Sequence, residues 1–142
     1  MPYEDSAATL GTTVHLAADF DDAVERTRET LKAEGFGVLT EVDVRAAFRE
    51  KLDRDFRPYV ILGACNPPLA FRALTEDPRV GLLLPCNVTV EAGLDGGSVV
   101  RLVDPLMLLA GSTIDASQEI RDVATDAAQR LERVAEQLRH GS

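Results

Sequence analysis

Two apolar runs, each ending in Cys-Asn, constrain the fold of this chain more than any other feature. The first, VILGACN, occupies residues 60–66, and the second, LLLPCN, occupies residues 82–87. Runs of this length without charged residues are typical of strands that are covered on both faces of a sheet. The sequence therefore predicts buried strands at residues 60–64 and 80–84.

A helix is expected between these two strands. Asn66 is a favourable N-cap, and Pro67 then stands at the first helical position. A backbone N–H at that position has no partner within the helix, so the N–H that proline lacks is not needed there. Residues 68–74 continue the helix, and Asp77 followed by Pro78 ends it. A strand, a helix and a second strand in this order are typical of a right-handed βαβ crossover. We therefore expect the two strands to be parallel and adjacent.

The rest of the chain alternates between strand and helix patterns. Alternating apolar residues indicate strands, acidic residues before apolar stripes indicate helix caps, and Asp-Gly indicates a tight hairpin. In the first half of the chain we expect a strand at 12–16, a helix from the Asp19 cap to Glu34 that ends at Gly35, a strand at 37–42, and a helix at 44–52 capped by Asp43. In the second half we expect an extended segment at 87–91, which turns at Asp95-Gly96 into a strand at 98–103. A helical turn at 105–109 and a long helix capped by Asp115 follow.

The order of these elements predicts an α+β fold. We expect a single domain over residues 1–142, with a mixed sheet of about five strands, one βαβ crossover, a β-hairpin and a long C-terminal helix. Residues 1–9 carry no periodic pattern, so we expect them to form a loose lead-in. The long helix should pack on the sheet through one apolar stripe at helical spacing: Ile120, Val123, Ala124, Ala127, Leu131, Val134 and Leu138.

Composition narrows the possible partners. The formal net charge is -9, so the chain should repel phosphate backbones and nucleic acid is not an expected partner. No apolar run approaches the roughly 18 residues that a membrane span needs. The N-terminus lacks a basic segment followed by an apolar one, so we expect a cytoplasmic protein. In that reducing compartment the two cysteines should be free thiols.

Cys65 and Cys86 mark the one place where chemistry could occur. In the parallel arrangement both would lie at the carboxyl ends of neighbouring strands, where open sheets bind ligands. Cys65 also precedes a helix N-terminus, which lowers a thiol pKa. We therefore expect a site for a small ligand, a sulfur species or a soft metal ion. The candidate ligand-binding residues are Cys65, Asn66, Pro67, Cys86, Asn87 and Lys51, and any metal would be held by Cys65 and Cys86.

A second hypothesis explains the same residues without a site. Cysteine is among the most frequently buried residues and packs as a small apolar side chain. The chain would then be a non-catalytic dimeric binding or scaffold protein. With only two histidines and no Cys-x-x-Cys, the usual zinc spacings are absent, and no nucleotide-binding or hydrolase motif occurs. The sequence thus specifies neither a catalytic residue nor a cofactor, and whether the protein is an enzyme stays open.

The two Cys-Asn segments also carry a family resemblance. Together with Arg57-Pro58-Tyr59 and Val103-Asp104-Pro105, they resemble the domain-of-unknown-function 302 family over residues 14–134. The resemblance implies a small α/β domain with a mixed sheet, usually a homodimer, and no settled biochemical function. Many members have His where this chain has Phe71. That departure weakens a metal or acid–base role here.

Overall fold

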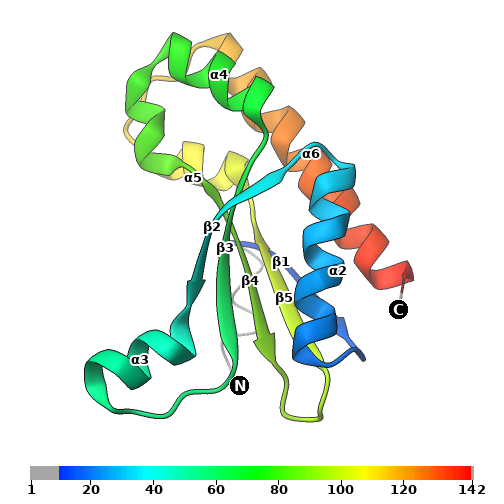
Figure 1. Cartoon of the computed structure of the whole chain (residues 1–142). Coiled ribbons are helices and arrows are strands. Elements are labelled where there is room, and N and C mark those ends of the chain that lie inside the picture. The colour runs from blue at the N-terminus through cyan, green and yellow to red at the C-terminus, as the bar shows by residue number, and fades with distance from the viewer. Residues whose placement is uncertain (1–9, 142) are drawn as a thin grey trace.

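The structure, a computed structural model, describes residues 10–141 and is built around a five-stranded sheet (Figure 1). All neighbouring strands are antiparallel, and their spatial order is β1-β5-β4-β3-β2. The α+β class and the five strands expected from the sequence are confirmed, whereas the lead-in at residues 1–9 lies outside the described residues. The strands are β1 (Gly11–Leu16), β2 (Gly37–Asp43), β3 (Tyr59–Cys65), β4 (Cys86–Ala92) and β5 (Ser98–Val103).

The helices fall into three groups around this sheet (Figure 1). Two long helices, α2 (Phe20–Ala33) and α6 (Gln118–His140), pack against each other and cover one face. One short helix, α3 (Val44–Leu52), projects beyond one end of the sheet. At the opposite end lie α4 (Pro67–Glu76), the 3-10 helix η2 (Pro78–Leu83) and α5 (Pro105–Gly111).

Local sequence signals set most helix boundaries. Asp19, Asp43 and Asn66 each stand at an N-cap, and the side chain of each accepts a hydrogen bond from the backbone N–H three residues later. These caps satisfy donors that the first helical turn leaves unpaired. At the other end of α2, Gly35 adopts a positive φ of 86° and stops the helix as expected.

The parallel pairing expected from the sequence is wrong. β3 runs antiparallel to β4, and residues 80–84, expected as a strand, fall almost entirely in η2. The side chain of Asp77 accepts a hydrogen bond from the Arg79 N–H and starts this 3-10 turn. A short apolar run is ambiguous between a strand and a buried helical turn. Over residues 10–141 the sheet is therefore antiparallel throughout and not mixed, and the expected βαβ crossover is absent.

The cap of the long helix also differs from the expectation. α6 begins at Gln118, and Ser117 is its N-cap, with Oγ accepting a hydrogen bond from the Ile120 N–H. Asp115 lies two residues before this cap. Serine and aspartate are similarly good caps, so the apolar stripe, which begins at Ile120, decides where the helix can start against the core.

The core is divided into two clusters. The larger one lies between the sheet and the pair α2 and α6, with side chains such as Leu31, Leu62 and Val134 fully buried. The smaller one lies beyond the end of the sheet, where α4 and η2 meet the first turns of α6. The expected stripe on α6 is confirmed: all seven of its residues are buried. Within the described residues, none of the helices has the length and apolar character needed to span a membrane.

Candidate functional site

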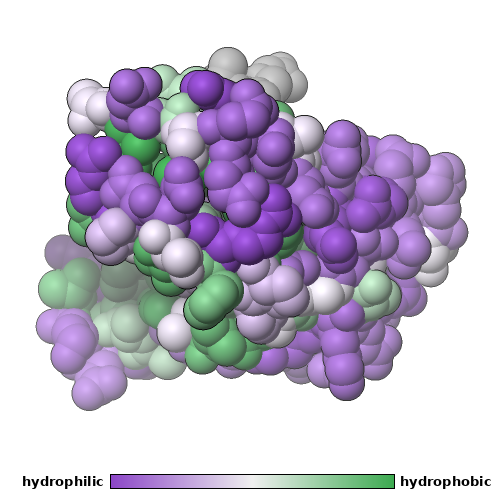
Figure 2. Space-filling model, turned by 90° about the horizontal axis from the view of Figure 1, so that it is seen from above, coloured by the Kyte–Doolittle hydropathy of each residue, from purple (hydrophilic) through white to green (hydrophobic). Residues whose placement is uncertain are grey.

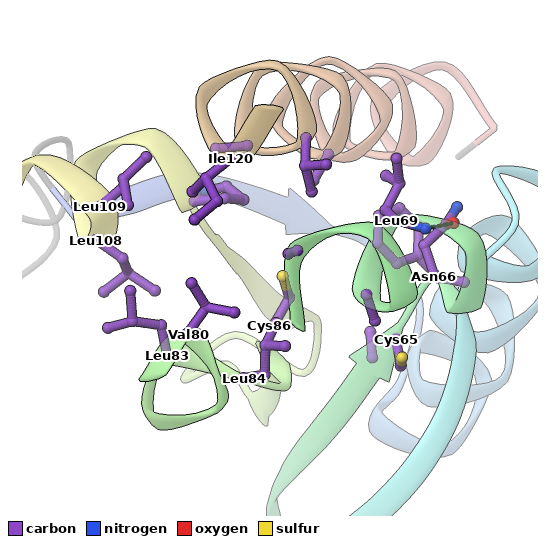
Figure 3. A pocket seen from close by; sticks show the side chains of 18 residues that line it. Cys65, Asn66, Leu69, Val80, Leu83, Leu84, Cys86, Leu108, Leu109 and Ile120 are labelled. Atoms are coloured by element: carbon purple, nitrogen blue, oxygen red, sulfur yellow. Dashed lines mark hydrogen bonds between the residues drawn. The ribbon is translucent and has the colours of Figure 1, made fainter. Parts of the chain in front are cut away.

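The two cysteines lie at the same end of the sheet, for a reason the sequence pattern did not indicate. Cys65 is the last residue of β3 and Cys86 is the first residue of the antiparallel β4. Cys86 pairs with Ala64, so these two side chains share the core face of the sheet. Cys65 follows Ala64 and turns to the other face, as alternation along a strand requires. Figure 3 shows the two sulfur atoms pointing in different directions.

A small cavity lies beside these strand ends. Its volume is about 80 Å³, and apolar side chains from α4, η2, α5 and α6 form most of its wall (Figure 3). Both cysteines and Asn66 contribute to the lining from the sheet side. The apolar part of the wall includes Leu69, Val80, Leu83, Leu109, Ile120 and Val123.

Both thiols are held in the protonated form. Burial, with a smaller contribution from the neighbouring Cys65, raises the pKa of Cys86 to about 11. Burial also raises the pKa of Cys65 above its ordinary value. The pKa of Cys65 is thus raised by burial and not lowered, as was expected from the N-terminus of the following helix. Neither sulfur is a ready nucleophile at neutral pH.

Asn66 is buried because its side chain caps α4. Its Oδ1 accepts a hydrogen bond from the Leu69 N–H at 3.3 Å and caps α4. Its Nδ2 lies so close to the turn after α2 that a Cβ on Gly35 would stand 2.8 Å away. Asn66 thus joins the start of α4 to the α2–β2 turn at the edge of the cavity.

Three of the residues expected in the site lie elsewhere. Lys51 is exposed on α3, at the end of the sheet opposite to the cysteines (Figure 1). Asn87 follows Cys86 on β4, so it turns to the opposite face, where it is exposed. Pro67 is exposed at the first position of α4 and does not line the cavity. The structure therefore brings together Cys65, Asn66 and Cys86 only.

A metal would find few ligands here. Among residues 10–141, no three His, Cys, Asp or Glu side chains gather closely enough to hold a metal ion. Cys65 and Cys86 supply two sulfurs that are protonated and point apart. This donor set does not fit the closed four-ligand sites that thiolates form with zinc.

The opposite wall of the cavity was not predicted from the sequence. It comes from α5 and from the first turns of α6, which carry Leu108, Leu109 and Ile120. The run LMLL at 106–109 is a signal that could have been used. A helical turn this apolar is expected to pack on other apolar side chains.

A charged cluster around the buried Glu91 of β4 was also not predicted from the sequence. Glu91 is almost fully buried and accepts hydrogen bonds from Arg57, at 2.5 Å, and from Arg101. The Arg57 guanidinium lies 4.5 Å above the Phe56 ring. Arg101 is on β5 and Arg57 is on the segment before β3, so Glu91 ties three parts of the chain together. The charges of the cluster pair with one another, and none of its three residues lines the cavity described above.

Comparison with known proteins places the chain in a family. A solved structure, the crystal structure of an uncharacterized conserved DUF302 protein from Bacillus stearothermophilus, superposes with a TM-score of 0.80 at 34% sequence identity. The match covers 92% of this chain and 98% of that one. Among curated proteins, none matches significantly. The profile of the family described as "Domain of unknown function DUF302" matches residues 12–138, and the chain belongs to this family.

Proposed function

We propose that this protein is a binding module for a small apolar molecule, held in the cavity at the cysteine end of the sheet. The observation that carries the proposal is the cavity itself: about 80 Å³ of space with almost entirely apolar walls. Apolar pockets with a few polar groups are the usual form of small-molecule sites. An apolar cavity that excludes water gains free energy when an apolar group fills it.

The size of the cavity limits what enters it. An apolar cavity of roughly 150 Å³ holds a benzene ring, so this one takes a shorter group, such as the end of an alkyl chain. The rest of a longer ligand would lie outside, on α4 and η2, where Phe71, Leu74 and Leu82 are exposed. On the face seen in Figure 2, hydrophobic side chains reach the surface between hydrophilic ones. A ligand with an apolar tail fits both features.

The protonated cysteines suit this function better than thiolate chemistry. A thiol in its neutral form packs as a small polarisable group and adds little polarity to the wall. Sulfur transfer and soft-metal binding both need a thiolate, which the raised pKa values disfavour. The experiments below therefore distinguish sulfur transfer and soft-metal binding from the binding of an apolar molecule.

Calorimetric titration with straight-chain 1-alkanols from propanol to octanol tests the proposal. We expect saturable binding that tightens with chain length until the cavity is full, with a negative heat-capacity change. Ala124→Leu fills the cavity and should abolish binding, because Ala124 lines it. Ala128→Leu is the matched control, because Ala128 is on the same helix outside this cavity. Unsaturable binding, or equal binding by both variants, contradicts the proposal.

The alternative functions have their own readouts. Titration with Cd²⁺ would produce a thiolate-to-metal absorption band in the ultraviolet if the cysteines held a soft metal. Incubation with polysulfide followed by mass determination would show added sulfur if either cysteine carried a sulfur species. Either result, obtained without alkanol binding, would replace the apolar ligand as the function of this site.

We further propose that the chain acts as a homodimer, as the family resemblance implies, and that it is cytoplasmic. The support is an amphipathic helix, α3, that has no buried residue in the single chain. Sedimentation velocity at micromolar concentration tests the assembly. A dimer whose cysteines are inert and whose cavity binds nothing would favour the scaffold hypothesis, in which the cysteines only fill the core.

A further inference from the structure

We infer that two copies of this chain meet through the segment that comprises β2, α3 and the residues up to Arg57, called here the arm (residues 37–57). The inference rests on the homodimer proposed above and adds the surface on which it forms. In Figure 1 β2 lies along β3, and the α3 end of the arm projects beyond the sheet, away from α2 and α6. Its contacts within the chain are mainly with β3 and the end of α2.

The arm exposes apolar side chains that a single chain leaves uncovered. The exposed fractions are 68% for Leu39, 47% for Val42, 37% for Phe48 and 63% for Leu52. Leu52 lies four residues after Phe48, so the two share one face of α3. A helix of nine residues is not stable in water without packing of its apolar face. Within the chain this face is covered in part, where Phe48 packs against Phe56, and its exposed remainder is surface that a partner would cover.

β2 is also an edge strand. Within the described residues it pairs only with β3, so the N–H and C=O groups of its outer side have no strand partner. The ladder is irregular between Val38 and Thr40, which places Leu39 at a bulge. Exposed edges are templates for pairing with another chain. A second copy would supply the missing strand.

The distribution of charge favours a second copy over another partner. The arm carries five acidic and five basic residues, while the whole chain has a net charge of -9. The entire acidic excess therefore lies outside the arm. Two arms bring together balanced sets of charges, whereas the rest of the chain carries on average an acidic excess that opposes its pairing with itself.

The residues of the arm are also of the types found at the centres of interfaces. Two of the seven aromatic side chains, Phe48 and Phe56, lie in the arm, and Tyr59 lies two residues after it. Phe48 meets Phe56 at 5.2 Å between ring centroids, and Phe56 meets Tyr59 at 6.1 Å. Arg57 lies over the Phe56 ring. Aromatic and arginine side chains are enriched in interface cores and carry much of the binding energy.

A contact between the same surface on two copies has two-fold symmetry. Under that symmetry β2 of one copy runs antiparallel to β2 of the other. The two sheets become continuous, and Leu39 and Val42 approach the arm of the partner. α3 of each copy then covers apolar surface at the junction.

Sedimentation velocity on arm variants tests this surface. Leu39→Glu and Leu52→Glu each place a carboxylate where two arms meet, so we expect a dimeric wild type and at least a tenfold weaker dimer in each variant. Leu94→Glu is the matched control, because Leu94 is 99% exposed in the turn between β4 and β5. Hydrogen exchange of the β2 amides gives a second readout: slow in the wild type and fast in the variants. Circular dichroism checks that the variants fold.

The possible outcomes separate the surface from the assembly. A monomeric wild type refutes both the homodimer and the arm contact. A dimeric wild type that keeps its affinity in both arm variants refutes the arm contact and leaves the homodimer standing. If Leu94→Glu weakens the dimer as much as the arm variants do, added charge rather than the arm explains the effect, and the inference fails.

Discussion

Cys86 lies directly opposite Ala64 in the antiparallel ladder of β3 and β4. This pairing sets the environment of both cysteines. Cys86 shares the core face with Ala64 and is buried, whereas Cys65, one residue further along β3, turns away and is partly exposed. Two thiols that are close in position therefore differ in access to solvent. The difference can be measured directly.

We predict that the two cysteines react at different rates with iodoacetamide in the native protein. Cys65 should react slowly, because its pKa is raised, and Cys86 should stay unmodified until the protein unfolds. Mass spectrometry of Cys65→Ser and Cys86→Ser assigns each rate. Cys86→Ser should keep the slow native reaction, and Cys65→Ser should lose it. Equal rates in the two variants would show that the ladder does not protect Cys86.

The raised pKa of Cys86 predicts a loss of stability in alkali. A group whose pKa rises on folding stabilises the native state below its unfolded pKa, and this stabilisation is lost as the pH rises through the folded value. For Cys86 the stabilisation is therefore lost between pH 9.0, the ordinary pKa, and about pH 11, the pKa in the folded protein. A shift of about two pKa units corresponds to at most about 3 kcal/mol of unfolding free energy.

Urea unfolding at pH 8 and at pH 11 measures this effect. Cys86→Ala removes the titrating group and should flatten the alkaline decline, whereas Cys65→Ala should keep most of it. A decline of the same size in Cys86→Ala and in the wild type would mean that other groups, such as tyrosines, cause it.

Local signals predicted the helices well, and non-local pairing was predicted poorly. The caps at Asp19, Asp43 and Asn66 depend on contacts within four residues, so the sequence alone could identify them. The direction of β4 depends on how α4 and η2 carry the chain back across the end of the sheet. Nothing within residues 80–84 distinguishes a strand from a 3-10 turn that packs its Val80 against α6.

The site was predicted in part for the same reason. Both Cys-Asn segments stood out in the sequence, and Cys65, Asn66 and Cys86 do line one cavity. Lys51 is a candidate in the sequence because it stands beside the apolar face of its predicted helix. In the antiparallel sheet, α3 instead follows β2 at the Asp43 end, whereas Cys65 pairs with Gly37 at the other end. The cavity wall could not be predicted without the positions of α5 and α6.

We predict that a side chain at Gly63 destabilises the protein. A Cβ at Gly63 would lie 2.1 Å from Thr40 Oγ1 and 2.8 Å from Pro85 Cγ. Gly63→Ala should therefore lower the unfolding free energy by about 1–3 kcal/mol through overpacking. Gly37→Ala is the matched control, since a Cβ there has no atom within 4 Å. Urea denaturation compares the two, and equal stability would contradict the close approach of Thr40 and Pro85 to β3.

The buried carboxylate of Glu91 predicts a loss of stability in acid. Burial raises its pKa, but hydrogen bonds from Arg101 and Arg57 outweigh burial, so the net pKa is lowered from 4.5. A group with a lowered pKa stabilises the native state above its unfolded pKa, and this stabilisation is lost as the pH falls through the folded value. The wild type should therefore lose stability below about pH 4.5.

Glu91→Gln isolates this contribution. At pH 7 it should lower the unfolding free energy by about 1–3 kcal/mol, because two arginines lose their charged partner. The variant should also lose less stability than the wild type on acidification, so the difference between them should shrink towards pH 3. Asp53→Asn is the control, with a side chain 94% exposed and little expected change at either pH. A constant difference across this pH range would mean that Glu91 contributes through packing and not through its charge.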